Sequence, residues 1–442
     1  MSAETTPSTS APGLTNTAID IKPGTGAVID SVNSARLWDR LNRLGEIGAF
    51  NDERTKSIGV CRLALTDKDA EGRLLVEQWM LDQGLTVTRD AIGNVYGRRE
   101  GRNPELAPVM IGSHIDSVAT AGRFDGCLGV VGGLEVFATL DDHGIVTERP
   151  LVTAFFTDEE GVRFGTDMLG SATAVGRLDL DWALSRTDRD GVSVAQELER
   201  HNITGEAAML EASPPHAYFE CHIEQGPVLL HNDKALGVVT GVQGISWWKI
   251  RIGGAAAHAG CTPMNARRDA GLALSNLRAA MHRLTDEIPG LLCNFGLLST
   301  TPGLTNVVPD TATATIDLRN PDEKALQQAE ERMHALIEEH ISVAGCELIS
   351  LDQTARTAPV DFHNALVDAI EVEIERRGID TMRLVSGAGH DAQELASLSP
   401  SAMIFVRGQN DGVSHSPREF STPEDCAAGV AVLTSMVLAV AN

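Results

Sequence analysis

The stretch that decides the fold runs from Ile111 to Gly129 and reads IGSHIDSVATAGRFDGCLG. It follows an apolar run, Ala107 to Ile111, which is typical of a buried strand, and its glycines predict a loop at the carboxyl end of that strand. Ligands bind at this edge of an open α/β sheet. His114 and Asp116 form a His-x-Asp pair that suits a metal site, because a carboxylate can hold the imidazole nitrogen that does not bind metal. Alone, such a pair is more often ordinary loop chemistry.

Strands and helices alternate on both sides of this stretch and predict an α/β layer architecture. Helical spacing of apolar residues predicts helices over 34–47 and 66–83, and apolar runs predict strands over 151–157 and 218–223. Near Ala235 the order changes to strand, helix, two strands, helix and strand, which is typical of a split βαβ domain. We therefore expect a flexible tail over 1–33, a catalytic domain over 34–234 and 356–442, and an α+β domain over 235–355 inserted into it.

Composition limits the classes of partner. The chain has 442 residues, which favours two domains, and its formal net charge of −25 makes nucleic acid a poor partner. Its seven cysteines are scattered without a CxxC, which argues against a disulfide framework and for a reducing compartment. We see no uninterrupted apolar stretch of membrane-spanning length and no signal peptide at the start. We expect a cytoplasmic protein without a membrane partner.

Four groups of metal-binding side chains stand at the end of an apolar run or in the loop after it. They are His114 with Asp125, Glu159 with Glu160, His222, and His415. Such a mixture of imidazoles and carboxylates suits two divalent ions, because one carboxylate can bridge two metals. In a Glu-Glu pair, one residue can bind metal while the other acts as a general base. Each group has an ordinary alternative: a Glu-Glu-Gly is most often a solvated turn, and a lone histidine is more often packed or exposed.

Seven segments of the chain carry a resemblance to one family. They read IGSHIDSV, RFDG, DEEGVRFG, HIEQGP, AAHAGCTPMNARRDA, GAGHDA and SHSPREF, and they resemble the M20 peptidase superfamily from about Leu37 to the C-terminus. HIEQGP and AHAG-x-TPM resemble, more narrowly, its amidase branch of N-carbamoyl-L-amino acid hydrolases, β-ureidopropionases and allantoate amidohydrolases. The resemblance implies a metal-dependent exopeptidase-like catalytic domain, α/β in class, with an inserted lid domain through which a homodimer forms.

The resemblance also implies two divalent metal ions per subunit. Their ligands would be His114 and His222 for one ion, Glu160 and His415 for the other, and Asp125 as the bridge. Zinc is the default ion for such ligands, with manganese, cobalt and nickel as alternatives.

The remaining implied roles concern catalysis and substrate. Asp116 would orient His114, Glu159 would be the general base, and His258 would stabilise the oxyanion. The substrate contacts would be Gln225, Asn306, Arg319, and Gly387, Ala388 and His390 of GAGHDA. Arg319 ends an alternating strand, where a guanidinium can grip a carboxylate with two hydrogen bonds. Without the resemblance, a surface arginine would be the better reading of Arg319, and a helix start that of GAGHDA.

These observations predict a binuclear amidohydrolase that cleaves the ureido C–N bond of N-carbamoyl-L-amino acids, giving the amino acid, carbon dioxide and ammonia. The substrate would be a small carboxylated ureido or amide compound. Departures from the family pattern at Cys221, Leu230, Cys261 and 407–410 leave its identity open. Allantoate amidohydrolase, β-ureidopropionase and an N-acyl amino acid amidase remain as enzymatic alternatives, and a catalytically silent metal-binding scaffold as the other class.

Overall fold

The computed structural model describes residues 18–21 and 32–442, so most of the predicted tail lies outside the described residues. The chain divides into two compact units. Unit 1 comprises the chain up to Gly241 and from Asp361 onward, and unit 2 is the insertion Val242–Val360. The sequence placed these limits at 235 and 355. The first limit moves because the strand β8 (Leu236–Val242) pairs with β18 (Ser401–Val406) in the sheet of unit 1.

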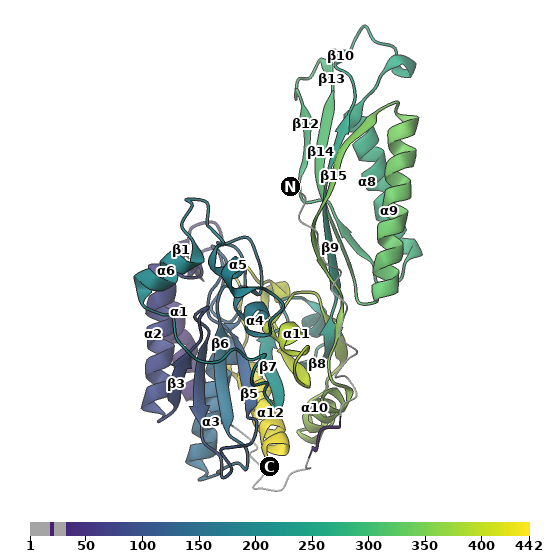
Figure 1. Cartoon of the computed structure of the whole chain (residues 1–442). Helices are drawn as coiled ribbons and strands as arrows, with labels where there is room; N and C mark the ends of the chain where they lie inside the picture. The colour runs from purple at the N-terminus through teal and green to yellow at the C-terminus, as the bar shows by residue number, and fades with distance from the viewer. Residues whose placement is uncertain (1–17, 22–31) are drawn as a thin grey trace. The chain divides into compact units, whose positions relative to one another are not determined.

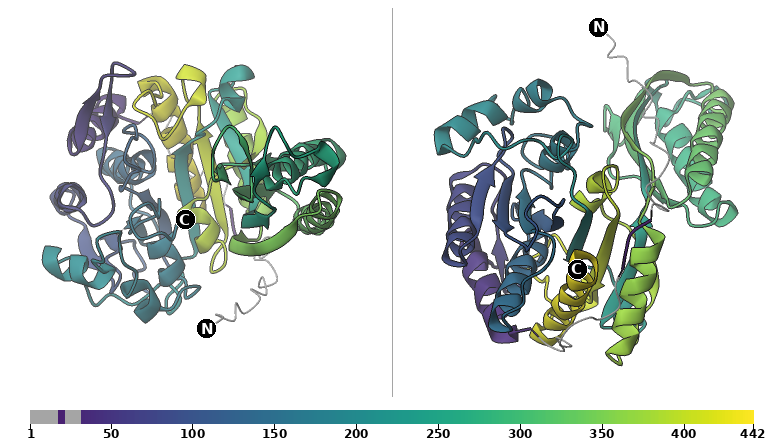
Figure 2. Two further views of the ribbon diagram at one scale, coloured as in Figure 1. Left: turned by 90° about the horizontal axis from the view of Figure 1, so that it is seen from above. Right: turned by 60° about the horizontal axis from the view of Figure 1, so that its bottom comes forward.

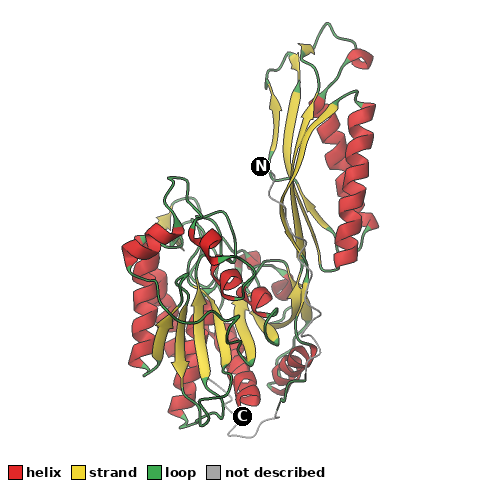
Figure 3. Cartoon of the chain, viewed as in Figure 1, coloured by secondary structure: helices red, strands yellow, loops and turns green. Residues whose placement is uncertain are grey.

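Unit 1 is built on a nine-stranded sheet, drawn in yellow in the lower part of Figure 3. The strand order is β16-β8-β18-β7-β5-β6-β4-β3, and β17 also pairs with β8. The four central strands, β18, β7, β5 and β6, run parallel, whereas their neighbours on both sides are antiparallel. The remaining strands are β3 (Thr86–Arg89), β4 (Val95–Arg99), β5 (Val109–His114), β6 (Leu151–Phe156), β7 (Ala217–Ile223), β16 (Val360–Asp361) and β17 (Arg383–Ser386).

The central strands are buried along their whole length, as expected for parallel strands covered by helices. Helices α3 (Cys127–Asp142) and α12 (Pro423–Ala441) pack on β7 and on each other (Figure 1). Helices α1 (Ser34–Glu46) and α10 (Asn364–Arg376) contact α12, and α2 (Asp67–Asp82) packs on β3 and β4. The shorter helices are α4 (Leu169–Ala174), α5 (Leu180–Leu184), α6 (Val194–His201), α7 (Val228–His231) and α11 (Asp391–Leu395). The predicted α/β class is confirmed.

Local sequence signals explain where individual elements begin and end. The hydroxyl of Thr66 accepts the backbone N–H of Asp69 and caps α2, and Gly84 follows the helix with φ of +74°. A small hairpin, β1 (Ala49–Asp52) with β2 (Ser57–Val60), joins α1 to α2.

Unit 2 is an antiparallel sheet with two long helices. The order is β11-β14-β9-β15, and β12 also pairs with β14. Helices α8 (Ala270–Glu287) and α9 (Glu323–Val343) lie side by side and pack on β14 and β9 (Figures 1 and 2). The strands are β9 (Gly244–Gly253), β11 (Leu292–Asn294), β12 (Leu298–Thr301), β14 (Thr311–Asn320) and β15 (Glu347–Thr357), with the ribbon β10 (Ala257–His258) and β13 (Val307–Val308). This is the predicted split βαβ order.

The strict alternation of TATATIDLR is explained by this packing. Every second residue of β14, from Ala312 to Leu318, is buried under α8 and α9, and the residues between are only half-buried. The core of unit 2 is therefore a single layer between one face of the sheet and the two helices.

One helix departs from the sequence analysis. α12 is long and apolar enough to cross a membrane by length and composition. However, 67% of its most apolar stretch is buried, and it packs on β7 and β18 as a core helix of unit 1.

Candidate metal centre

The parallel strands bring the predicted ligands to one edge of the sheet. His114 is the last residue of β5, and His222 the last but one of β7. Glu159 and Glu160 follow the end of β6, and His415 lies in the loop after β18. Because β5, β6, β7 and β18 run in the same direction, their carboxyl ends meet. Four segments far apart in the sequence thus converge, as predicted.

The carboxylate of Asp125 lies at the centre of this group. Its Oδ1 is 3.2 Å from Nε2 of His222 and 3.8 Å from Nε2 of His114. Its Oδ2 is 3.3 Å from Nε2 of His415, and that nitrogen is also 3.3 Å from a carboxylate oxygen of Glu160. The two oxygens of one carboxylate therefore face two separate ligand sets, which is the arrangement that bridges two metal ions.

The other nitrogen of each buried imidazole is held by the backbone. Nδ1 of His114 contacts the carbonyl oxygen of Asp116 at 3.0 Å, and Nδ1 of His222 contacts the carbonyl of Ile223 at 2.8 Å. Each contact places a proton on Nδ1, so Nε2 is the nitrogen that becomes free to bind a metal ion when a cation replaces the proton it shares with Asp125. Both rings are thus preset in the tautomer that binds a metal through Nε2.

Charge is concentrated in this group. Burial opposes ionisation of Asp125, but hydrogen bonds from His222 and His415 outweigh it and hold the pKa of that carboxyl well below its usual range. Burial also opposes protonation of His222, yet Asp125 raises its pKa to about 9. Hydrogen bonds to Asp125 and Glu160 raise the pKa of His415 to about 11. The carboxylates attract positive charge to this place, and divalent cations can supply it in place of protons.

Three further buried carboxyls, Glu159, Asp116 and Asp158, stand in the segments that carry the ligands. Glu159 is buried, its Oε2 lies 3.4 Å from Nε2 of His114, and burial followed by the charge of Glu160 raises its pKa well above the usual range. Asp116 is buried as well, and burial raises its pKa to about 8. Neither oxygen of the buried Asp158 has a hydrogen-bond partner in the described structure. Buried carboxylates in this number, with unused acceptor atoms among them, fit a site that holds cations.

The predicted role of Asp116 takes a different form in the structure. Its carboxylate oxygens accept the backbone N–H groups of Glu159 and Glu160 at 3.3 and 3.4 Å, whereas its Oδ1 is 3.8 Å from Nδ1 of His114. Asp116 contacts the imidazole through its carbonyl oxygen instead. Its side chain positions the Glu-Glu pair.

Two predicted substrate contacts lie beside the ligands. Nε2 of Gln225 donates to Oδ2 of Asp125 at 3.0 Å, and its Oε1 is buried without a partner in the described structure. The His390 ring lies 4.5 Å from that of His222, and its Nε2 contacts the hydroxyl of Ser386 at 2.9 Å. That hydroxyl also bonds the backbone of Ala388, next to Gly387, so the GAGHDA loop is tied to the neighbourhood of the ligands.

The other three predicted residues belong to unit 2. The exposed His258 pairs with Val307 in the β10–β13 ribbon, next to Asn306, whose carbonyl accepts the N–H of Ala259 at 3.0 Å. Nδ1 of His258 accepts the backbone N–H groups of Gly260 and Cys261, which leaves Nε2 as the proton-bearing nitrogen. His258 is therefore preset as a neutral hydrogen-bond donor.

Arg319 does not join them. It lies near one end of β14, opposite Ile245, whereas Thr311 at the other end of β14 is opposite Gly253. Arg319 is eight residues after Thr311 along the strand, a distance of about 26 Å, and the β10–β13 ribbon lies beyond the end of β14 where the strand begins (Figure 1). Within one chain, Asn306 and Arg319 cannot contact the same small carboxylate. The guanidinium of Arg319 contacts Asp317, two residues away, at 3.0 Å.

The sequence analysis missed Glu419 and Ser414. The buried carboxylate of Glu419 accepts the backbone N–H of Asp125 at 3.2 Å, and the hydroxyl of Ser414 lies 3.0 Å from Oδ2 of Asp125. Both stand in the GVSHSPREF segment around His415. The only sequence signal was an acid four residues after a predicted ligand, but a charged residue in a polar loop is usually exposed.

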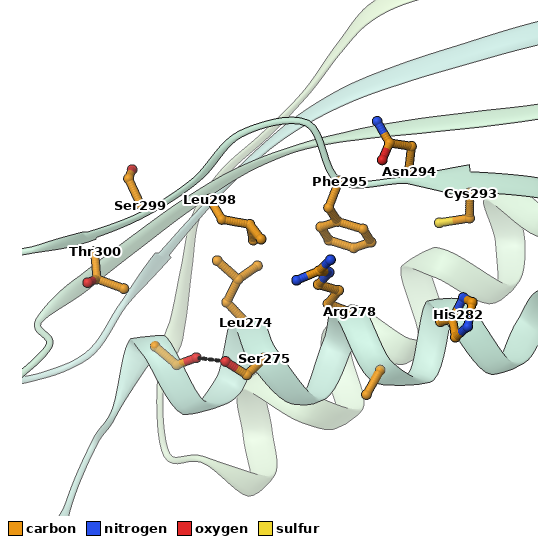
Figure 4. Close-up of a pocket in the computed structure, with 12 residues that line it drawn as sticks. Leu274, Ser275, Arg278, His282, Cys293, Asn294, Phe295, Leu298, Ser299 and Thr300 are labelled. Atoms are coloured by element: carbon orange, nitrogen blue, oxygen red, sulfur yellow. Dashed lines mark hydrogen bonds between the residues drawn. The ribbon is translucent and has the colours of Figure 1, made fainter. Parts of the chain in front are cut away.

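A groove of about 600 Å³ lies elsewhere, between α8 and the edge strands of unit 2 (Figure 4). Leu274 and Arg278 of α8 face Phe295 and Leu298 across it. The groups of metal-binding side chains in the described structure lie in unit 1 and not in this groove.

Comparisons with known proteins agree with this geometry. Residues 110–439 match the family model described as peptidase family M20/M25/M40. An N-carbamoyl-L-amino acid amidohydrolase of Geobacillus stearothermophilus is 39% identical over 91% of this chain and 97% of its own length. A probable allantoate deiminase of Oryza sativa is 33% identical over 88% of this chain and 86% of its own length. The crystal structure of a hydantoinase/carbamoylase family amidase from Burkholderia multivorans has a TM-score of 0.88 and 42% identity over 93% and 98% of the two chains.

Proposed function

The chain belongs to the peptidase family M20/M25/M40, and from that membership we propose that it hydrolyses N-carbamoyl-L-amino acids to the amino acid, carbon dioxide and ammonia. The observation that carries the proposal is Asp125, whose two oxygens face two ligand sets, with the buried carboxyl of Glu159 next to them. That arrangement suits hydrolysis of an unactivated C–N bond, which requires both an activated water and a proton for the leaving nitrogen.

Five side chains would hold two divalent ions. They are His114 and His222 for one, Glu160 and His415 for the other, and Asp125 between them. Divalent ions bound there supply Lewis-acid chemistry, acidifying a water molecule and polarising the carbamoyl oxygen. Zinc is the ion that imidazole and carboxylate ligands most often hold, and manganese, cobalt and nickel are the competitors.

Glu159 moves the proton. Its carboxylate accepts the proton of the attacking water and then donates it to the substrate nitrogen, so that the C–N bond breaks with a neutral amine as the leaving group. The backbone N–H groups of Glu159 and Glu160 are held by Asp116, which fixes the direction of both side chains. His258, with its proton on Nε2, donates a hydrogen bond to the oxyanion.

Arg319 is the reason to expect a carboxylate on the substrate. A guanidinium at the end of β14 offers two parallel N–H groups to one carboxylate. Its present partner, Asp317, is a carboxylate too, and therefore marks the chemistry that this guanidinium binds.

Two features support a homodimer that forms through unit 2. His258 and Asn306 lie far along β14 from Arg319, so a second copy is needed to bring the two groups to one substrate. The edge strand β12 is exposed throughout; its first residue, Leu298, is 43% exposed, and Leu292 of β11, which pairs with β14 as β12 does, is 57% exposed. The unpaired backbone groups of such an edge strand are a template for pairing with another copy of the chain. Light scattering of Leu298→Lys against wild type tests this, since a charge on the edge should yield a monomer.

The experiment that tests the function starts from protein treated with EDTA and reconstituted separately with zinc, manganese, cobalt or nickel. Ammonia release is followed with N-carbamoyl-L-amino acids, their D forms, N-carbamoyl-β-alanine and allantoate, and free amino acid with an N-acetyl amino acid. Metal-dependent turnover of the L-carbamoyl compounds supports the proposal. Exclusive turnover of allantoate or of N-carbamoyl-β-alanine would show that this compound, and not an N-carbamoyl-L-amino acid, is the substrate. Stoichiometric binding of metal without turnover of any compound would favour the catalytically silent scaffold.

The rival with a specific observation behind it is allantoate hydrolysis. A relative of that name matches 88% of this chain, and allantoate also carries a carboxylate next to ureido nitrogen. The L-carbamoyl reading is preferred because the amidohydrolase relative is more similar and nearly coextensive.

A further inference from the structure

We propose that Glu419 positions the bridging carboxylate of the metal centre, acting on Asp125 through the hydroxyl of Ser414 and through the backbone. The proposal rests on the proposed function only in taking Asp125 as a metal ligand. Within the described structure, the Glu419 carboxylate bonds the backbone N–H groups of Phe124 and Asp125 and the hydroxyl of Ser414, and no side chain of a predicted ligand, so it is a positioning residue.

Glu419 holds the backbone that carries Asp125. Its Oε1 accepts the N–H of Phe124 at 3.0 Å and that of Asp125 at 3.2 Å. These residues lie just before α3, whose first residue is Cys127. One buried oxygen therefore fixes two successive peptide groups, and with them the direction from which the Asp125 side chain leaves the main chain.

Room for this contact is made by Gly122. A Cβ added there would lie 2.4 Å from both Cβ and Oε1 of Glu419, which is closer than non-bonded carbon and oxygen atoms approach a Cβ. Any other residue at position 122 would displace the carboxylate. The absence of a side chain at Gly122 thus leaves room for the Glu419 carboxylate.

The second oxygen reaches Asp125 through a hydroxyl. Oε2 of Glu419 lies 2.8 Å from Oγ of Ser414, and the same Oγ lies 3.0 Å from Oδ2 of Asp125. A serine hydroxyl has one proton to donate, so the two carboxylates compete for it. When the Ser414 hydroxyl donates its hydrogen bond to Glu419, it donates none to Oδ2 of Asp125, and the electron pairs of that oxygen stay available for a cation.

This relay predicts the effect of an isosteric change. In Glu419→Gln, the amide oxygen still accepts both N–H groups, but the amide nitrogen donates to Ser414 and directs the serine proton to Asp125. A carboxylate oxygen that accepts this additional bond is a weaker ligand. Residues that orient metal ligands typically contribute 10–100-fold to metal affinity, and we expect a loss of that size for at least one Zn²⁺.

The test is Zn²⁺ titration of the metal-free full-length protein against a chelating dye, for wild type, Glu419→Gln, Ser414→Ala and the double variant. Glu424→Gln, an exposed acid in the first turn of α12, is the matched control and should bind as wild type. Thermal unfolding in EDTA reports the fold and should be unchanged in Glu419→Gln. In the Ser414→Ala background, Glu419→Gln should add less than about a threefold change, because the relay is already absent.

The outcomes separate the proposals. Wild-type affinity in Glu419→Gln overturns the positioning role while leaving the proposed function intact. Additive losses in the double variant overturn the path through Ser414. A lowered unfolding temperature in EDTA with a parallel affinity loss overturns the role in favour of a structural one. If wild type binds no divalent ion, the proposed function fails first, and this inference with it.

Discussion

The carboxylate of Asp116 accepts the backbone N–H of Glu159 at 3.3 Å, and it does so from a loop that follows a neighbouring strand. The side chain that the sequence assigned to orienting His114 instead fixes the main chain of the proposed general base. His114 is held by the Asp116 carbonyl, which no side-chain substitution removes. Substituting the Asp116 side chain therefore tests its contact with the backbone of Glu159 while the carbonyl contact with His114 remains.

Asp116→Asn should lower kcat by about 10–100-fold with metal content unchanged. The amide oxygen can still accept one N–H, but the amide nitrogen would face the N–H of Glu160 and push the Glu-Glu pair out of place. Ammonia release and metal analysis on the same preparation check this. Loss of bound metal would show instead that the carboxylate holds His114 despite the 3.8 Å separation.

Glu159→Gln should lower kcat/KM by about 10²–10⁴-fold, the usual contribution of a general acid–base residue. Its five neighbouring ligands are untouched, so two metal ions should remain by elemental analysis. Glu160→Gln is the matched control, and it should lose metal. Because Oε2 of Glu159 is only 3.4 Å from His114, a fall in metal content in Glu159→Gln would make Glu159 a ligand.

The ligand positions could be predicted from sequence because they depend on chain direction alone. His114 and His222 stand at the ends of apolar runs, and parallel pairing of β5 with β7 brings those ends together. The insertion was predicted from the change in element order near Ala235, and the alternating TATATIDLR predicted a strand with one covered face.

What could not be predicted depends on distances across the fold. No local pattern brings Arg319 and Asn306 together, because the strand predicted over TATATIDLR already separates Arg319 from Thr311 by about 26 Å, and only the resemblance gave both residues one carboxylate. Nor does a sequence reveal that Glu419 is buried against the N–H of Asp125, since charged loop residues are usually solvated. Contacts made by the backbone, such as that of the Asp116 carbonyl with His114, also leave no pattern in the sequence.

Gly126→Ala should abolish metal binding at the His114 site. A Cβ at position 126 would lie 2.4–2.5 Å from three ring atoms of His114, and φ there is +66°. Gly144→Ala is the control, because its φ of +64° imposes the same backbone strain with no atom within 4 Å. Gly144→Ala should bind Zn²⁺ as wild type and lose about 1 kcal/mol of stability. Equal losses of metal in both variants would attribute the effect to strain.

Arg319→Ala should raise KM for carbamoyl amino acids by about 10–100-fold, the equivalent of one charged hydrogen-bonded contact, with a smaller effect on kcat. The variant should also lose preference for the acid over the corresponding carboxamide. Arg251→Ala, an exposed arginine on β9 of the same unit, is the control. Retained preference in Arg319→Ala would show that the substrate carboxylate binds elsewhere.

Glu373→Gln should destabilise the fold at neutral pH and not in acid. The Glu373 carboxylate accepts Arg377 at 2.9 Å, and Arg377 donates to the Ala431 carbonyl of α12, so the pair ties α10 to α12. Burial raises the pKa of Glu373, but hydrogen bonds from Arg376 and Ser435 and the charge of Arg377 outweigh it and lower that pKa.

A lowered folded-state pKa means that the unfolded chain binds a proton more readily. The contribution of Glu373 is therefore fully present above the unfolded pKa of about 4.3, and it is lost as pH falls through the lower folded pKa. We expect a difference of about 1 kcal/mol at pH 7, since one partner, Arg376, is 44% exposed and screened by solvent. Unfolding of wild type, Glu373→Gln and the exposed control Glu375→Gln, in EDTA at several pH values from 7 to 3, measures it. Protonated glutamate and glutamine are both neutral and have nearly the same shape, so a difference that persists at the acid end would show that the charge of Glu373 does not cause the loss.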